Sequence, residues 1–304
     1  MEQKNQRWGQ NKKYSCNWQE YNDELVRRGT FFFQISFLEK EIRELERMNT
    51  NKVGRPYEYS NSFIEFQARL HSWLDYRGIE GFTRAIAEHI KGMKANDFSN
   101  ICRRVNSLDI KLALPNEKHI YAAYDSTGFK VSNRGEWMRQ KWDVRRGWIK
   151  AHIIADVKTK KLIDIEITTE KDGCDGEVLQ RQLNRIDTKN IFKLSADGAL
   201  DRRDVFNQLK DHGIEPAIKP RKNASTKSHG SFSRAQQVRE FKKKGYEQWA
   251  KDKKYGQRWA TEGKFSAVKR KFGETIRATK QENMLHEAKT KFLIYEQMRN
   301  YAQT

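Results

Sequence analysis

The sequence predicts an α/β protein in which a helical N-terminal domain precedes a domain built on a mixed sheet. Up to about residue 112, apolar residues recur at helical spacing, with a break marked by glycine and proline at 49–56. Beyond that point the chain changes to short runs rich in isoleucine, valine, threonine and aromatic residues, which are typical of strands. The change predicts an N-terminal domain of residues 1–112 and a C-terminal domain of residues 113–304.

The N-terminal domain is expected to consist of helices. They are predicted from Trp18 to about Met48, with a strand-like phenylalanine cluster at 31–33, and at 60–74, 81–90 and 99–108. Residues 81–108 resemble two helices joined by a polar turn, which fits a helix-turn-helix with Arg103 and Arg104 exposed on its second helix. An ordinary helical hairpin with solvated arginines fits the same residues equally well.

The second domain shows a definite order of elements. Strands are predicted at 119–124, 148–157 and 161–169, then a helix at 175–186, a strand ending before Asp197, a helix near 201–212 and a short strand at 214–218. The order βββαβαβ, followed by a helix, is that of a ribonuclease H-like sheet. In that order the first strand is central and the fourth strand lies beside it.

Four chemically diverse polar residues follow at helical spacing: Tyr255, Arg258, Glu262 and Lys269. At about 100° per residue they share a sector of about 60° on one side of a helix. The adjoining apolar stripe, which would pack on the sheet, consists of Phe265, Val268, Phe272 and Ile276. Glu262 would therefore stand at the edge of a core with cations beside it, where an acid that binds metal and meets a phosphodiester would be needed.

Two aspartates upstream fit the same site. Asp125 ends a short β-prone run, and Asp197 ends another strand-like run just before a predicted helix. Acids at two strand ends and Glu262 on a helix could hold divalent cations, because Mg²⁺ and Mn²⁺ prefer acidic oxygen ligands. Taken singly, each acid has an ordinary interpretation as a turn-forming aspartate or a surface glutamate.

These motifs resemble those of the DDE transposases of prokaryotic insertion sequences, most of all insertion-sequence family five. The resemblance rests on YDSTGFK around Asp125, ADGALDRRDV around Asp197 and the Tyr-Arg-Glu-Lys spacing, and it covers roughly residues 20–300. It implies a ribonuclease H-like catalytic domain in which Asp125, Asp197 and Glu262 are catalytic and bind two Mg²⁺ or Mn²⁺ ions. It also implies an enzyme that binds terminal inverted repeats, hydrolyses double-stranded DNA to a free 3′-OH and transfers that strand into target DNA, as a homodimer in the synaptic complex.

Further residues are candidates for DNA contacts. Arg258 and Lys269 would bind phosphates, and Tyr255 would hydrogen-bond a phosphate or stack on a base. The alternative for these residues is a helical ion-pair network with Glu262. The remaining candidates are Arg145 and Arg146 in the tryptophan-rich basic segment 134–150, Arg103 and Arg104, and Arg55, which would enter a minor groove or belong to a plain turn.

Composition agrees with a nucleic-acid partner. The chain has 60 Lys and Arg against 40 Asp and Glu, a net charge of +20, which favours a polyanion. Its three cysteines are too few and too scattered for a disulfide framework or a zinc site. Neither a membrane-spanning run nor a signal peptide is apparent, so we expect a cytoplasmic, nucleoid-associated protein without a membrane partner.

Two other functions remain open from the sequence. A ribonuclease H-like nuclease or junction resolvase would need the same acids, but no preference for terminal repeats and no strand transfer. A domesticated DNA-binding protein derived from a transposase would need neither reaction, although the presence of all three acids argues against it.

Overall fold

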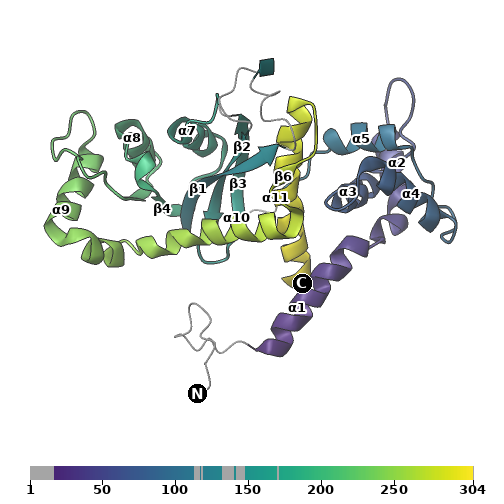
Figure 1. The fold of residues 1–304 in the computed structure, drawn as a ribbon, viewed down its shortest axis with the longest axis horizontal. Coiled ribbons are helices and arrows are strands. Elements are labelled where there is room, and N and C mark those ends of the chain that lie inside the picture. Colours follow the sequence, from purple (N-terminus) through teal and green to yellow (C-terminus); the bar gives the residue numbers. More distant parts are fainter. Residues whose placement is uncertain are drawn as a thin grey trace.

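The computed structural model describes residues 17–112, 117, 119–131, 140–141, 148–169 and 171–303. Figure 1 shows helices at the N-terminal end of the chain and a sheet flanked by helices in the remainder. The predicted α/β class and the order of a helical part before a mixed sheet are therefore confirmed. None of the helices in the described ranges is long and apolar enough to cross a membrane.

The sheet has the strand order β3-β2-β1-β4-β5, with β6 pairing beside β1. Its strands are β1 (Ile120–Val131), β2 (Trp148–Asp156), β3 (Leu162–Thr169), β4 (Ile191–Ala196), β5 (Glu215–Ile218) and β6 (Thr275–Ile276). β2 pairs antiparallel to β1, and β3 to β2, whereas β4 and β6 run parallel to β1. The first strand is central and the fourth lies beside it, as predicted.

Strand β1 is longer than the sequence predicted, and Asp125 lies within it rather than at its end. The run Ser126-Thr-Gly128 looked like a turn, but it continues the ladder with β2, where Gly128 pairs with Lys150. A Cβ atom on Gly128 would stand 2.6 Å from the ring of Trp148. Glycine therefore leaves room for the tryptophan ring at this position, and pairing of β1 with β2 outweighs the local turn preference of the glycine.

The N-terminal helices are α1 (Trp18–Phe33), η1 (Ser36–Glu39), α2 (Glu41–Asn49), α3 (Asn61–Leu70), α4 (Tyr76–Ala87) and α5 (Phe98–Asn106). The phenylalanine cluster at 31–33 ends α1 and forms no strand, which corrects that expectation; Phe31 and Phe32 are buried. Helix α4 begins five residues before the expected Gly81, because Asp75 caps it by accepting a hydrogen bond from Gly78 N.

The later helices are α7 (Asp175–Arg185), η2 (Gly198–Leu200), α8 (Arg203–Asp211), α9 (Phe232–Asp252), η3 (Tyr255–Arg258), α10 (Trp259–Phe272) and α11 (Gln281–Gln303). The predicted helix from Tyr255 onward is a 3₁₀ turn followed by an α-helix. Helix α10 ends at Phe272 because Gly273 adopts a φ of 76°. Ile276, expected on the helical stripe, lies in β6 instead.

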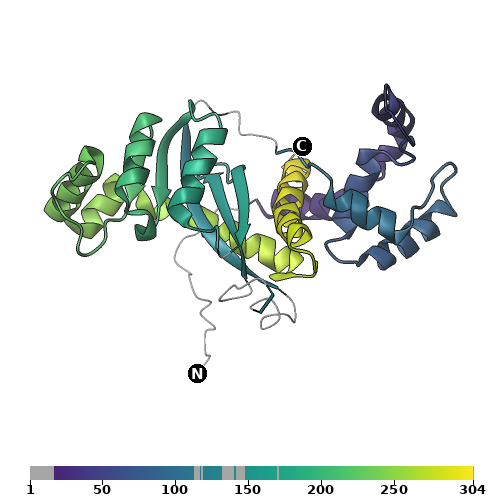
Figure 2. The same ribbon diagram turned by 90° about the horizontal axis from the view of Figure 1, so that it is seen from above.

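The sheet carries a hydrophobic core on each face. One core contains Tyr124 of β1 and the buried side chains of α7 and α8. The other contains Phe129 of β1, the buried faces of α10 and α11, and the N-terminal helices. In Figure 2, α11 (yellow) lies between the N-terminal helices and the sheet. Residues on both sides of position 112 therefore share one core, as when Phe32 and Phe272 approach to 6.3 Å between ring centroids.

Candidate active site

Asp125 stands on the central strand, on the face covered by α10. Because side chains alternate along a strand, Asp125 shares its face with Phe129 and not with Tyr124. Its carboxylate is one-fifth exposed and accepts hydrogen bonds from Ser126 N at 2.9 Å and from Arg258 Nη1 at 2.9 Å. Thr261 Oγ1 on α10 lies 3.4 Å from the same carboxylate. Strand and helix together fix the position of this acid.

Asp197 follows the neighbouring parallel strand directly. Its side chain is exposed and accepts a hydrogen bond from Ala199 N at 2.9 Å, which caps the short helix η2. The charge of Asp197 affects the pKa values of both Asp125 and Tyr255. Asp197 is therefore close enough to act electrostatically on the site formed by β1 and α10.

Glu262 lies in the first turn of α10, where the helix dipole favours a negative charge. Its side chain is more than half exposed, and its Oε1 accepts a hydrogen bond from Arg258 Nη2 at 2.6 Å. Gly263, which follows it, does not interrupt the helix. The glutamate thus faces solvent at the edge of the core, as its helical position predicted.

Arg258 binds two of these three acids at once. One nitrogen of its guanidinium contacts Asp125 and another contacts Glu262. Burial opposes the charge of the guanidinium, but Asp125, Tyr255 and Glu262 outweigh this effect and raise the pKa of Arg258. This ion pair is the network that the sequence offered as the alternative to a phosphate contact.

The other two carboxylates act on Asp125 electrostatically. Burial is the main reason why the pKa of Asp125 is raised, and the charges of Asp197 and Glu262 raise it further. The hydrogen bond from Ser126 N and the charge of Arg258 oppose this shift. A cation placed among these acids is therefore favourable, and Arg258 supplies one in this structure.

The donor atoms at this site fit a hard divalent cation. Carboxylate oxygens from Asp125, Asp197 and Glu262 are the ligand type that Mg²⁺ and Mn²⁺ prefer. Within the described ranges, however, no three His, Cys, Asp or Glu side chains are grouped closely enough to hold a metal ion. The chemistry of the acids suits a metal, and Arg258 lies between two of them, so a bound metal would compete with this guanidinium.

Lys269 and Tyr255 are less accessible than the sequence suggested. Lys269 Nζ donates hydrogen bonds to Thr127 Oγ1 and to Gly128 O of β1, both at 2.8 Å. Tyr255 is 9% exposed, and its ring centroid lies 5.2 Å from that of Trp249. Each side chain therefore packs against the protein. Tyr255 lies close enough to Asp197 for that charge to act on its pKa, whereas the charges that act on Lys269 are those of Glu274 and Lys130.

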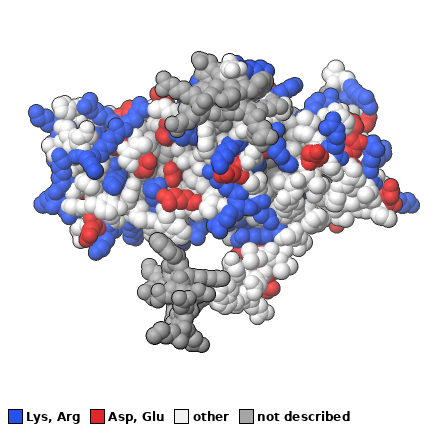
Figure 3. Space-filling view, in the orientation of Figure 1, with Lys and Arg blue, Asp and Glu red and all other residues white. Residues whose placement is uncertain are grey.

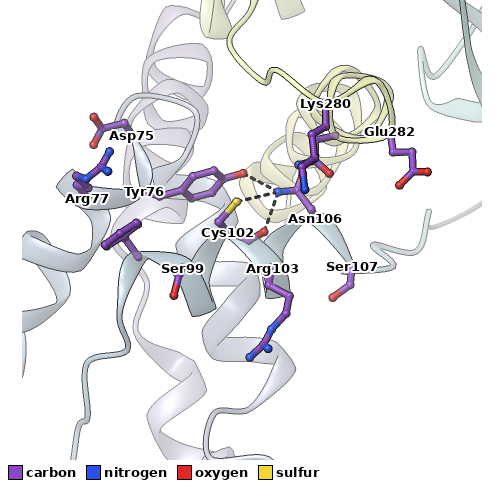
Figure 4. Close-up of a pocket in the computed structure, with 12 residues that line it drawn as sticks. Asp75, Tyr76, Arg77, Ser99, Cys102, Arg103, Asn106, Ser107, Lys280 and Glu282 are labelled. Carbon is purple, nitrogen blue, oxygen red and sulfur yellow. Dashed lines mark hydrogen bonds between the residues drawn. The ribbon is translucent and has the colours of Figure 1, made fainter.

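The two arginines of α5 that were predicted to contact DNA differ in their exposure to solvent. Arg103 is exposed and lines two hollows of about 600 and 700 Å³ beside α5; in Figure 4 it points away from the hydrogen-bonded group of Tyr76, Cys102 and Asn106. Arg104 is not exposed as expected, because its guanidinium donates to Tyr59 O and Asn61 Oδ1.

Arg55 lines the larger of these two hollows together with Arg103 and Arg104. Arg55 is highly exposed and pairs with Glu58.

The connection between α4 and α5, residues 88–97, is longer than the three or four residues usual in a helix-turn-helix. Arg145 and Arg146 fall outside the described residues.

A buried polar cluster lies beneath Asp125 on the opposite face of the sheet. His152 is fully buried; its Nδ1 lies 2.9 Å from Tyr124 Oη and 3.1 Å from Asp175 Oδ1. Asp175 also accepts from Lys150 Nζ at 2.8 Å. In the sequence, the signal of this cluster is the alternation of Tyr124 with Asp125 along one strand, which places the tyrosine on the face opposite the aspartate.

Basic side chains surround much of this region. On the face drawn in Figure 3, Lys and Arg gather over α9 and around α10. Aromatic rings lie under several of these cations: Lys160 Nζ is 5.2 Å from the ring centroid of the exposed Trp259, and Lys219 Nζ is 4.8 Å from that of Tyr246. A surface of this composition suits the phosphates and bases of a nucleic acid.

Comparison with known proteins agrees with this site. A family model described as a transposase DDE domain matches residues 117–296, and a second model with the same description matches residues 26–134. The first match spans more than half of the chain and contains all three acids. The chain therefore belongs to the family of transposases with a DDE domain.

One solved structure shows a weaker similarity. It is described as the cryo-EM structure of a piggyBac transposase synaptic complex with hairpin DNA, and it matches with a TM-score of 0.35 and 9% sequence identity. The match covers 92% of this chain and 78% of that chain. A likeness of this size is too weak to indicate a common fold by itself.

Proposed function

We propose that this protein is the transposase of a prokaryotic insertion sequence related to family five. It binds the terminal inverted repeats of its element, hydrolyses the DNA to a free 3′-OH and joins that end to target DNA. The observation that carries the proposal is the position of Arg258, which joins Asp125 of β1 to Glu262 of α10, while the charge of Asp197 at the end of β4 acts on Asp125. The family model that spans these acids supports the same conclusion.

The acids and cations of the site have separate tasks. Two Mg²⁺ or Mn²⁺ ions, when bound by Asp125, Asp197 and Glu262, would activate the attacking oxygen and neutralise charge on the leaving oxygen. Arg258 and Lys269 would bind phosphates near the scissile bond, with the planar fork of Arg258 exchanging its present carboxylate partners for phosphate oxygens. The hydrogen bonds of Lys269 to Thr127 and Gly128 would hold its charge at β1, the strand that carries Asp125.

The rest of the chain supplies binding to DNA. We assign recognition of the terminal repeats to residues 1–112, with Arg103 and Arg55 as contacts and Arg104 as a residue that orders α5 against Tyr59 and Asn61. Arg145, Arg146 and Tyr255 complete the proposed set of DNA contacts. A net charge of +20 supports this partner, and such a transposase would work in the cytoplasm, on the nucleoid, as a pair of chains holding two ends.

The deciding experiment supplies a pre-cleaved repeat end that carries a free 3′-OH. Asp125→Asn, Asp197→Asn and Glu262→Gln should each abolish both hydrolysis and joining while repeat binding persists, because each removes one charge from the metal ligands. Asp211→Asn, an exposed acid on α8, is the matched control and should keep full activity. Wild-type activity should require Mg²⁺ or Mn²⁺ and fail in Ca²⁺, whose coordination is looser.

The outcomes also separate the competing functions. Joining at the wild-type rate by any of the three variants would show that its residue is not a catalytic ligand. Cleavage without any joining, and without preference for repeat ends, would identify a nuclease or resolvase. Binding without either reaction in the wild-type chain would identify a DNA-binding protein derived from a transposase.

A further inference from the structure

The turn that carries Asp197 has few hydrogen bonds of its own. Asp197 follows β4 directly, and the chain then forms η2 before it enters α8. A 3₁₀ helix as short as η2 has poor hydrogen-bond geometry and holds its own conformation weakly. Inside the turn, Ala199 N donates to the carboxylate of Asp197, and Asp201 N donates to Gly198 O at 3.3 Å. The position of the Asp197 carboxylate therefore depends on contacts with other segments of the chain.

Arg221 contacts this turn with both its backbone and its side chain. It lies three residues beyond the end of β5, the strand that runs parallel to β4. Its guanidinium donates hydrogen bonds to Gly198 O at 3.2 Å and to Ala199 O at 3.0 Å. Its backbone N donates to Asp201 Oδ2 at 2.9 Å. Arg221 thus binds three of the four residues that follow Asp197.

The far end of the same turn is attached to α9 by a buried ion pair. The side chain of Asp201 is fully buried and accepts from Arg234 Nε at 2.6 Å and from Arg234 Nη2 at 2.9 Å. A pair with two parallel hydrogen bonds fixes direction as well as distance. Arg234 lies in the first turn of α9, where the helix dipole disfavours a cation. Stabilisation of α9 does not explain this arginine, whereas its contact with Asp201 does.

The segment after β5 approaches the turn closely. A Cβ atom on Gly198 would stand 3.1 Å from Lys219 O, which is nearer than ordinary van der Waals contact. Gln237 of α9 donates to Ile218 O at 3.1 Å and so fixes the end of β5 as well. The glycine directly after Asp197 therefore leaves room for the segment that brings Arg221 to the turn.

We propose that Arg221 is a positioning residue for Asp197. Its bonds to two carbonyls, together with the buried pair of Asp201 and Arg234, hold the turn in one conformation. The Asp197 carboxylate is thereby fixed relative to β1 and α10 before metal or DNA binds. A ligand that is ordered in advance loses less conformational entropy when the metal binds. This task rests on the proposed function, in which Asp197 is a metal ligand, and it needs no contact of Arg221 with metal or DNA.

The position of the acid is measured by hydrogen exchange, followed by NMR in the full-length chain without metal or DNA. The amide of Ala199 is bonded to the carboxylate of Asp197, so its exchange rate reports on that contact. Arg221→Gln should speed this exchange by roughly fivefold, because the turn opens more often. Since Arg221 is exposed to solvent, the melting temperature should stay largely unchanged.

Lys222→Gln is the matched control for this measurement. It removes an exposed cation from the same segment, and within the described part of the chain Lys222 makes no hydrogen bond to the turn. Its exchange rate at Ala199 should equal that of the wild type. Equal exchange in Arg221→Gln and in Lys222→Gln would overturn the proposal.

The link to metal binding is tested by a double-mutant cycle on Mn²⁺ affinity in the absence of DNA. Arg221→Gln should raise the Mn²⁺ dissociation constant by roughly fivefold, and it should have no such effect when Asp197→Asn is already present. By charge alone, removal of a cation would strengthen Mn²⁺ binding, so the expected change has the opposite sign to the electrostatic effect. Tighter binding in Arg221→Gln, or an equal loss in both backgrounds, would overturn the proposal.

The two measurements separate failure of the positioning role from failure of the proposed function. An Asp197→Asn variant that binds Mn²⁺ as the wild type does would overturn the assignment of Asp197 as a metal ligand. The exchange rate at Ala199 needs neither metal nor DNA, so it would still show whether Arg221 fixes the acid.

Discussion

The guanidinium of Arg258 donates a hydrogen bond at 2.9 Å to the carboxylate of Asp125, which lies 133 residues earlier in the chain. The same guanidinium reaches Glu262 one helical turn further on. A single cation thereby joins the central strand to the helix that covers it, and it occupies space between two proposed metal ligands.

Replacing Arg258 with alanine should therefore have two opposite effects. Affinity for Mn²⁺ in the absence of DNA should rise, because the competing guanidinium is gone, and binding of cleaved ends should weaken by about 1.5–3 kcal/mol if a charge-assisted contact is lost. Electron paramagnetic resonance would measure free Mn²⁺, and a gel-shift assay would measure end binding. Unchanged Mn²⁺ affinity would show that Arg258 does not compete with metal.

Lys269 should contribute to stability as well as to DNA binding. Lys269→Met removes two hydrogen bonds to β1 and should lower the free energy of unfolding by about 1–2 kcal/mol. Lys130→Met is the control. Lys130 lies on β1 and pairs with Glu274, and because both side chains are about half exposed, loss of this pair should change the free energy of unfolding little. Urea denaturation of both variants checks the difference; equal stabilities would mean that the bonds of Lys269 to β1 contribute nothing.

The buried pair of Lys264 and Glu296 should hold α10, and with it Glu262, in place. Glu296 joins Lys264 on α10 to α11 and also accepts a hydrogen bond from Leu162 N of β3 at 3.0 Å. Burial, opposed by the charge of Glu296, lowers the pKa of Lys264 to about 8. Glu296→Gln leaves the lysine without its counter-charge and should cost about 3–5 kcal/mol of stability at neutral pH.

A double variant separates the ion pair from packing at the same positions. Lys264→Met combined with Glu296→Gln removes both charges and keeps an acceptor for Leu162 N, so it should be more stable than Glu296→Gln alone. Chemical denaturation of the single and double variants measures this coupling. If the double variant is the less stable of the two, an unpaired buried charge is not the cause of the loss.

His71 should make the fold sensitive to mild acid. Its ring stacks on Tyr76 at 4.2 Å, and burial, followed by the charge of Arg277, lowers its pKa to about 4 against the opposing charge of Glu287. The unfolded chain therefore takes up a proton at this residue before the folded chain does. Stability should fall as the pH decreases from about 6.5 towards 4, by at most about 3 kcal/mol from this group.

The contribution of His71 is measured as a difference between variants. His71→Gln cannot take up the proton, so its melting temperature should decline less between pH 7 and pH 4 than that of the wild type. His89→Gln, which alters an exposed histidine among the N-terminal helices, should decline as the wild type does. Parallel curves for His71→Gln and the wild type would refute the assignment.

Local patterns in the sequence predicted much of this protein correctly. The positions of most strands along the chain and the place of Asp197 after one of them followed from runs of β-branched and aromatic residues that end in polar turn residues. The place of Glu262 at the edge of a core followed from helical spacing, because Phe265 and Val268 are buried while the glutamate is exposed. Both features depend on residues a few positions apart, and such spacing is visible in a sequence.

Contacts between distant segments of the chain decided the features that local patterns did not predict. Asp125 looked like a strand end because Gly128 is a turn signal on its own, and only the ring of Trp148 explains that glycine. Arg104 looked free to read DNA until Tyr59 and Asn61 were placed beside it. The sequence alone determined which acids and which elements this protein has. Which cation stands between the acids, and which core holds the N-terminal helices to the sheet, were decided by tertiary packing, because no local pattern specifies partners more than a hundred residues away.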